Sequence, residues 1–110
     1  MGLLHLIVHR SMIEEELASG LTPPEKKPRL QAVLERIREV EFRESLVQHI
    51  VYDNDDPDIP EGIHHVVEMC QGFSSVILYG ISISVCLPFC ERRLQEAGLS
   101  VRYDVAGTIE

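Results

Sequence analysis

The stretch GFSSVILYGISISVCLPFCERRLQEAGLSVRYDVAG, residues 72–107, decides the fold of this chain. Its pattern predicts a fully apolar strand over residues 76–79, a helix over 86–97 and a second strand over 99–105. Gly98 stands where a helix C-cap is expected. A strand, a crossover helix and a second strand form a βαβ unit, whose right-handed connection makes the two strands parallel.

The residues before this stretch show the same alternation. Apolar runs over 3–8 and 46–52 predict two more strands. Three further helices are expected, and they cover residues 11–17, 25–41 and 58–70. Ser11 and Glu14 have capping-box spacing, which places the start of the first helix at Ser11.

The element order is therefore β-α-α-β-α-β-α-β within a single domain over residues 1–110. It predicts an α/β fold with a small, mainly parallel, four-stranded sheet and helices on both faces, a Rossmann-like three-layer α/β/α arrangement. Ligands of such sheets bind outside the carboxyl ends of the strands. Four strands leave sheet edges that a second copy could cover, so a homo-oligomer is expected.

Composition and charge exclude several classes of partner and location. The net charge is −8, with only 10 Lys and Arg residues, which argues against a nucleic-acid partner. The N-terminal MGLLHLIVHR is too short and too interrupted for a signal peptide or a membrane span, so we expect a cytoplasmic protein. Three cysteines without a secretory signal are expected to be free thiols. No cofactor or metal is expected.

Cys86 is the residue whose position favours chemistry. It stands between a predicted strand and a predicted helix, where unpaired N–H groups and the helix dipole favour a thiolate. Burial in the core is the alternative for any cysteine, and we expect it for Cys70 and Cys90. Adjacent His64 and His65 point about 100° apart on a helix, so they do not suggest a shared metal ion.

The segment Gly80-Ile-Ser-Ile-Ser-Val-Cys86-Leu resembles the isochorismatase-like cysteine hydrolases, the family that includes the nicotinamidases. Members typically show a glycine, a strand, G-[VIL]-x-[TS]-x-x-C-V, a helix, a glycine and a strand. Gly72, Gly98 and the following Leu-Ser-Val fit this order, and Val105-Ala-Gly stands where the family often has Asp-Ala. The likeness covers roughly residues 60–107.

The resemblance implies that Cys86 attacks the carbonyl carbon of a small amide and that helix N–H groups hold the oxyanion. The family also uses an aspartate after the first strand and a lysine from a later one. Here the first strand ends in His9-Arg-Ser, and the second in His49-Ile-Val-Tyr-Asp53. We therefore expect His9 to act as the base and Asp53 to orient it.

Two other functions remain open from the sequence. Cys86-Leu-Pro-Phe-Cys-Glu-Arg92 fits C-x5-R, the phosphate loop of cysteine phosphatases, although Pro88 lacks an N–H and Glu91 would repel a phosphate. The chain could also be a catalytically decayed subunit or binding module that forms an oligomer. An active enzyme would need only a small-molecule substrate as its partner.

Overall fold

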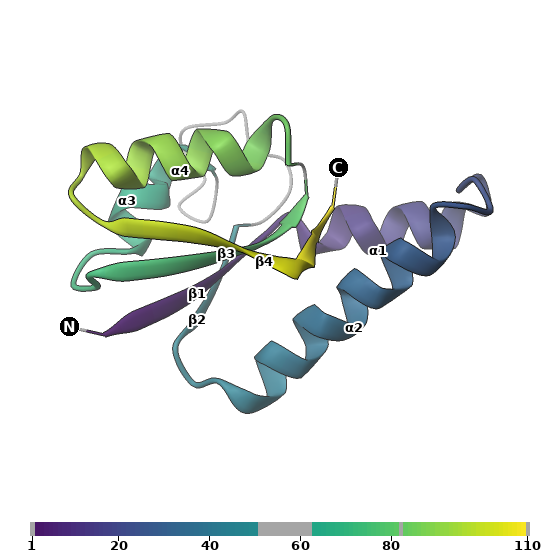
Figure 1. Cartoon of the computed structure of the whole chain (residues 1–110), viewed down its shortest axis with the longest axis horizontal. Helices are drawn as coiled ribbons and strands as arrows, with labels where there is room; N and C mark the ends of the chain where they lie inside the picture. Colours follow the sequence, from purple (N-terminus) through teal and green to yellow (C-terminus); the bar gives the residue numbers. More distant parts are fainter. Residues whose placement is uncertain (1, 51–62, 82, 110) are drawn as a thin grey trace.

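A computed structural model describes residues 2–50, 63–81 and 83–109 of the chain. These residues form four strands, four α-helices and one 3₁₀ turn (Figure 1). In chain order they are β1 (Leu3–Val8), α1 (Arg10–Ser19), α2 (Lys27–Arg43), β2 (Val47–Ile50), the 3₁₀ turn η1 (Ile63–His65), α3 (Val66–Met69), β3 (Ser75–Ile81), α4 (Cys86–Glu96) and β4 (Ser100–Ile109).

The strands form one parallel sheet in the order β2-β1-β3-β4, which confirms the predicted fold class. Helices α1 and α2 cover one face of the sheet, and α3 and α4 cover the other (Figure 1). This distribution follows from the strand order. The chain moves one way along the sheet from β1 to β2, and the opposite way from β2 to β3 and from β3 to β4. Right-handed crossovers that run in opposite directions place their helices on opposite faces.

Strand β1 lies at the centre and shows how the sheet divides the core. Leu4, Leu6 and Val8 pack toward α3 and α4, while Ile7 packs toward α1 and α2. This alternation has the period of two that a strand imposes on its side chains. Both faces are covered, so the strand is nearly all apolar, as a central parallel strand requires. Its one polar side chain is His5.

The backbones of β1 and β3 approach closely where the two strands end. Val8 pairs with Gly80, and a Cβ placed on Gly80 would lie 2.0 Å from the Val8 carbonyl oxygen. Gly80 also has a φ of 114°, a left-handed conformation that residues with a Cβ rarely adopt. Glycine is therefore the residue that lets β1 and β3 pair up to their carboxyl ends.

Two boundaries differ from the sequence prediction. Helix α1 begins at Arg10 with His9 as its N-cap, and no side chain caps it, so the capping-box prediction at Ser11 was wrong. Strand β4 continues to Ile109 instead of ending at residue 105. It does so through a bulge, because the pairing moves from Leu78 with Tyr103 to Gly80 with Thr108. The third helix is described only from residue 63, and its expected beginning lies outside the described residues.

Within the ranges that the structure describes, no helix is long and apolar enough to cross a membrane.

Replacing Gly80 by alanine should destabilise the fold by about 3 kcal/mol or more, because the added Cβ collides with backbone and the φ is strained. Gly98→Ala is the matched control. Gly98 has a φ of 92°, but nothing lies within 4 Å of the place that a Cβ would occupy there, so its substitution should cost about 1 kcal/mol, the cost of the conformation alone. Urea unfolding followed by circular dichroism measures both values, and equal losses would contradict the close-approach argument.

Candidate functional site at the carboxyl edge of the sheet

The order of the strands defines where a ligand can enter this fold. The chain leaves β1 toward α1 on one face, and it leaves β3 toward α4 on the other face. β1 and β3 are neighbours, so at their adjacent carboxyl ends the chain turns to opposite faces of the sheet. This is the topological switch point at which open α/β sheets bind their ligands. Of the three site residues predicted from sequence, Cys86 and His9 lie on these two turns.

Cys86 is the first residue of α4, with Val85 as the N-cap. Its side chain is half-buried and packs against the core cluster between the sheet, α3 and α4. The 11-residue helix α4 has at this terminus the positive end of its dipole and the first N–H groups, which have no acceptor within the helix. The thiol is therefore partly accessible beside donors that stabilise negative charge.

The other two thiols are enclosed. Cys70 and Cys90 are fully buried, and burial raises the pKa of Cys70 to about 11. Burial, with smaller contributions from Cys86 and Cys70, raises the pKa of Cys90 well above its ordinary value. Both remain protonated and inert near neutral pH, as expected for structural cysteines. No disulfide joins the three.

His9 follows β1 directly and adopts a left-handed conformation, with φ 55° and ψ 45°. It is the only non-glycine residue with positive φ in the described ranges. Its N–H donates to the carbonyl of Ile50 at the end of β2. The side chain is 5% exposed, and this burial lowers its pKa from the ordinary 6.5. The imidazole is thus neutral at pH 7 and able to accept a proton. Backbone strain of this kind is concentrated at functional sites.

Asp53, predicted to orient His9, lies outside the described residues. Arg92 of the alternative C-x5-R motif is exposed and lies within α4. Because the motif is helical from its cysteine onward, Cys86 and Arg92 are about 120° apart around the helix axis and six residues apart along it, so they do not surround a common anion. This geometry weighs against the phosphatase alternative.

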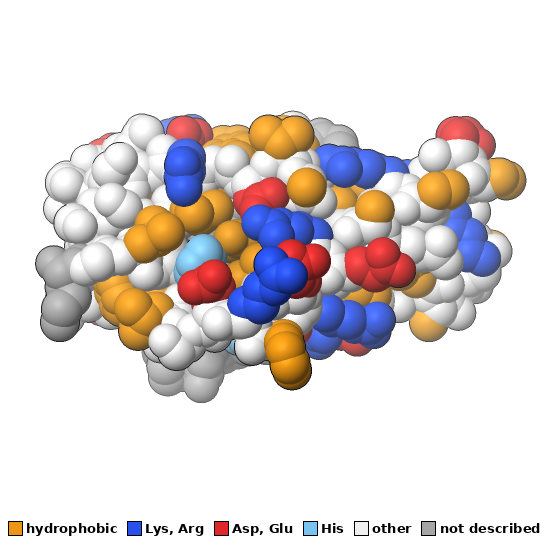
Figure 2. Space-filling view, turned by 60° about the horizontal axis from the view of Figure 1, so that its bottom comes forward, with side chains coloured by type: hydrophobic (Ala, Val, Ile, Leu, Met, Phe, Trp, Pro, Cys, Tyr) orange, Lys and Arg blue, Asp and Glu red, His pale blue; other side chains and the backbone are white. Residues whose placement is uncertain are grey.

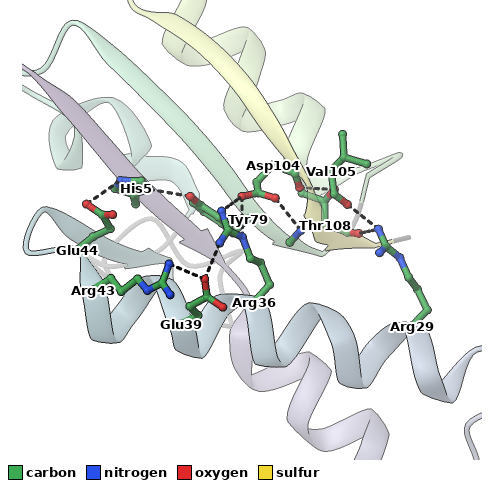
Figure 3. Close-up of polar contacts among 11 residues, drawn as sticks. His5, Arg29, Arg36, Glu39, Arg43, Glu44, Tyr79, Asp104, Val105 and Thr108 are labelled. Atoms are coloured by element: carbon green, nitrogen blue, oxygen red, sulfur yellow. Dashed lines mark hydrogen bonds and ion pairs between the residues drawn. The ribbon is translucent and has the colours of Figure 1, made fainter.

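A second polar cluster, which sequence reasoning missed, lies between the sheet and α2 (Figure 3). The Tyr79 hydroxyl is 2.7 Å from Nδ1 of His5, whose Nε2 lies 3.5 Å from the Glu44 carboxylate. The facing carboxylate favours the proton on Nε2, so the Tyr79 hydroxyl donates to Nδ1. Burial raises the pKa of Tyr79 to about 12, and the hydroxyl stays protonated.

Asp104 anchors the other half of this cluster. Its Oδ2 accepts hydrogen bonds from Nε and Nη2 of Arg36 at 3.0 and 2.8 Å, and its Oδ1 accepts one from the Gly107 N–H at 3.1 Å. Arg29, near the start of α2, donates to the carbonyls of Val105 and Thr108. These contacts tie α2 to the bulge of β4.

The cluster borders an open hollow of about 360 Å³ on the α2 side. Figure 2 shows this face, where apolar side chains surround a histidine beside a band of mixed acidic and basic side chains. His5, Tyr79, Arg36 and Asp104 already pair with one another or with neighbours. We therefore assign the cluster a structural role. The polar His5 within the apolar run 3–8 was the sequence signal that could have pointed to it.

Comparison with known proteins gives no relative. No protein-family model matches the chain, no curated protein is significantly similar to it, and no solved structure matches it.

Acid should destabilise the protein through His9. Its folded-state pKa lies below the unfolded value of 6.5, so the unfolded chain binds the extra proton first as the pH falls. The stabilising contribution is complete above pH 6.5 and is lost as the pH drops below it. Urea unfolding at pH 7.5 and 5.5 should show this loss in the parent and a smaller one in His9→Asn, which keeps a residue that tolerates positive φ. His64→Asn, at an exposed position, should behave as the parent does; an unchanged loss in His9→Asn would contradict the assignment.

Removing the Asp104 carboxylate should loosen α2. Asp104→Ala leaves the Arg36 guanidinium and the Gly107 N–H without their shared acceptor, at an expected cost of about 2 kcal/mol. Arg38→Ala is the control, because the Arg38 side chain is 57% exposed and its ion pair with Glu14 is as long as 4.0 Å. This substitution should lower the free energy of unfolding by less than about 0.5 kcal/mol. Urea unfolding measures the loss of stability in both variants, and similar losses would show that the contacts of Asp104 with Arg36 and Gly107 do not hold α2 to the sheet.

Proposed function

We propose that the protein hydrolyses a small amide or related carbonyl compound with Cys86 as nucleophile, in a crevice that we place at the switch point between the β1–α1 and β3–α4 turns. One observation carries the proposal: the half-buried thiol at the start of α4 and the left-handed, neutral His9 flank the same topological switch point. The resemblance to isochorismatase-like hydrolases around Cys86 supports the same chemistry, while the absence of a family match means that the support is local.

Helix α4 would supply the oxyanion site. The first N–H groups of a helix have no intrahelical acceptor. At this terminus they belong to Cys86 and Leu87, because Pro88 at the third position has none. Two converging backbone donors are what a tetrahedral intermediate of acyl transfer requires.

The reaction would proceed in two steps. Neutral His9 takes the proton of the Cys86 thiol, and the thiolate attacks the carbonyl carbon and forms a C–S bond while the C=O electron pair moves to the oxygen. Collapse of this intermediate breaks the C–N bond, and the amine leaves with a proton from protonated His9. Neutral His9 then takes a proton from water, whose hydroxide attacks the thioester and releases the acid and the thiolate, which recovers the proton from His9. One amide and one water yield one acid and one amine.

The rim of the crevice favours a substrate with an apolar part. Ile83 and Val85, on the turn before Cys86, are 40% and 66% exposed. Isolated exposed aliphatic residues are ordinary on a surface, but these two flank the nucleophile on one short turn. They would contact the acyl or amine substituent of the substrate and exclude water from it.

A non-catalytic binding module is the second candidate. It is favoured by the departure from the resembled family at the two positions expected to hold aspartate and lysine. Such a module would keep the crevice and the Cys86 thiol without turnover, so a measurement of turnover separates the two functions.

Reaction with p-nitrophenyl acetate and p-nitroacetanilide tests the hydrolase. The parent should release p-nitrophenolate in a burst and then turn over, with one acetyl group on Cys86 shown by peptide mass spectrometry. Cys86→Ser and His9→Asn should each lower the steady-state rate by about 100-fold or more. His64→Asn, the same change at an exposed histidine, should leave the rate unchanged.

Thiol accessibility provides the matching structural test. Iodoacetamide should label Cys86 alone in the folded protein and all three cysteines after denaturation, because Cys70 and Cys90 are fully buried. Stoichiometric acetylation of Cys86 without turnover would overturn the hydrolase and leave the binding module. Equal turnover by Cys86→Ser would exclude Cys86 from any reaction the protein performs.

A further inference from the structure

The free edge of β4 carries an inference that does not depend on the proposed function. β4 is the last strand of the sheet, with β3 as its neighbour on one side. The Ser100 N–H donates to the Ser74 carbonyl, at the start of β3. Successive residues of a strand point their backbone groups to opposite sides, so Val101 and Tyr103 point their N–H and C=O groups away from the sheet.

The two halves of this edge differ in whether other residues cover their outward backbone groups. In the second half, Arg29 donates to the outward carbonyl of Val105 at 2.6 Å and to Thr108 at 3.0 Å, and the bulge interrupts regular pairing. Such features protect an edge from further strands. Among the described residues, no comparable contact covers the backbone of Val101 or Tyr103. Figure 1 shows β4 along the margin of the sheet, with α4 above it and α2 below.

We propose that two copies of the chain pair antiparallel along residues 102–104 of β4, about a two-fold axis at Tyr103. Val101 then lies opposite Val105 of the other copy, whose carbonyl already accepts from Arg29, so the ladder is centred on the Tyr103 pair. In that register Tyr103 of one copy faces Tyr103 of the other. Each Tyr103 N–H donates to the other copy's Tyr103 carbonyl, as in the hydrogen-bonded pairs of an antiparallel ladder. The two four-stranded sheets become one sheet of eight strands.

Charge selects this register. With the axis at Tyr103, Arg102 of each copy lies opposite Asp104 of the other, which gives two cross-strand pairs of opposite charge. Moving the axis by one residue to Arg102 would place two arginines opposite each other, which is destabilising. The side chain of Arg102 is exposed and can reach across.

Asp104 can serve both contacts. Its carboxylate already accepts hydrogen bonds from Arg36 and Gly107 within its own chain, and a carboxylate offers about four acceptor positions. Arg36 therefore holds the carboxylate in place for the arriving Arg102. The self-complementary spacing, a cation and an anion on either side of the axis residue, identifies a second copy of this chain as the occupant.

Sedimentation velocity over a range of protein concentrations tests the dimer. The parent should sediment as a dimer that dissociates on dilution, and Arg102→Asp should weaken association by about tenfold or more, because two acidic residues then face each other. Arg92→Asp makes the same charge change at an exposed position on α4 and should leave association unchanged. Circular dichroism verifies that both variants fold. A parent that is monomeric at all concentrations, or equal weakening by both variants, would overturn the proposal.

Cysteine cross-linking tests the register in a Cys86→Ser background, where the remaining thiols are buried. Tyr103→Cys places two thiols on residues whose Cα atoms should be about 5.5 Å apart, within disulfide range. Arg102→Cys is the control, since its two copies lie diagonally at about 8 Å, beyond that range. Mild oxidation should cross-link the first variant alone on a non-reducing gel. Preferential cross-linking of Arg102→Cys would overturn the axis at Tyr103.

Discussion

The pairing of β1 with β3 is the constraint on which the rest of this structure depends. These two strands form the centre of the sheet and are covered on both faces. Their register brings Val8 against Gly80, where backbone fills the space that any Cβ would need. The contact fixes where both strands end, so it also fixes the starting points of the turns that carry His9 and Cys86. The position of the proposed site is thus set by a glycine that takes no part in the proposed chemistry.

The two faces of the sheet are held by different forces. On the α4 face the contact is mainly apolar: Leu87, Cys90 and Leu94 are fully buried against the strands, beside one hydrogen bond from the Tyr103 hydroxyl to Glu91. On the α2 face an apolar core is supplemented by polar contacts that reach the sheet from α2, chiefly Arg36 to Asp104 and Arg29 to the bulge of β4. Directional contacts position an element more specifically than apolar burial does. They hold the bulge in register, and the bulge in turn limits the part of the β4 edge that stays open.

Much of this fold could be predicted from local patterns. Three patterns predicted the correct elements: the run 3–8, the stripe of Leu30, Val33, Leu34 and Ile37, and the strand–helix–strand unit over residues 76–105. They did so because burial on one or two faces leaves a periodicity in the sequence. The start of α1 was misplaced because His9 adopts a left-handed conformation that no local pattern signals. The bulge of β4 was missed because it depends on Tyr79 and on α2, both distant in sequence.

The polar sites can also be separated into features that local sequence patterns predict and features that only the fold brings together. A thiol at a helix start and a histidine at a strand end are local features, and strand order brings them to one switch point. The His5–Tyr79–Asp104–Arg36 cluster could not be predicted, because its members come from four separate elements. The proposed chemistry and the proposed association lie at different places on the sheet: the candidate site is at the carboxyl ends of β1 and β3, whereas the open half of β4 lies at the start of the last strand. Pairing through that edge would extend the sheet sideways and leave both crevices accessible, so a dimer and an active site are compatible in one molecule.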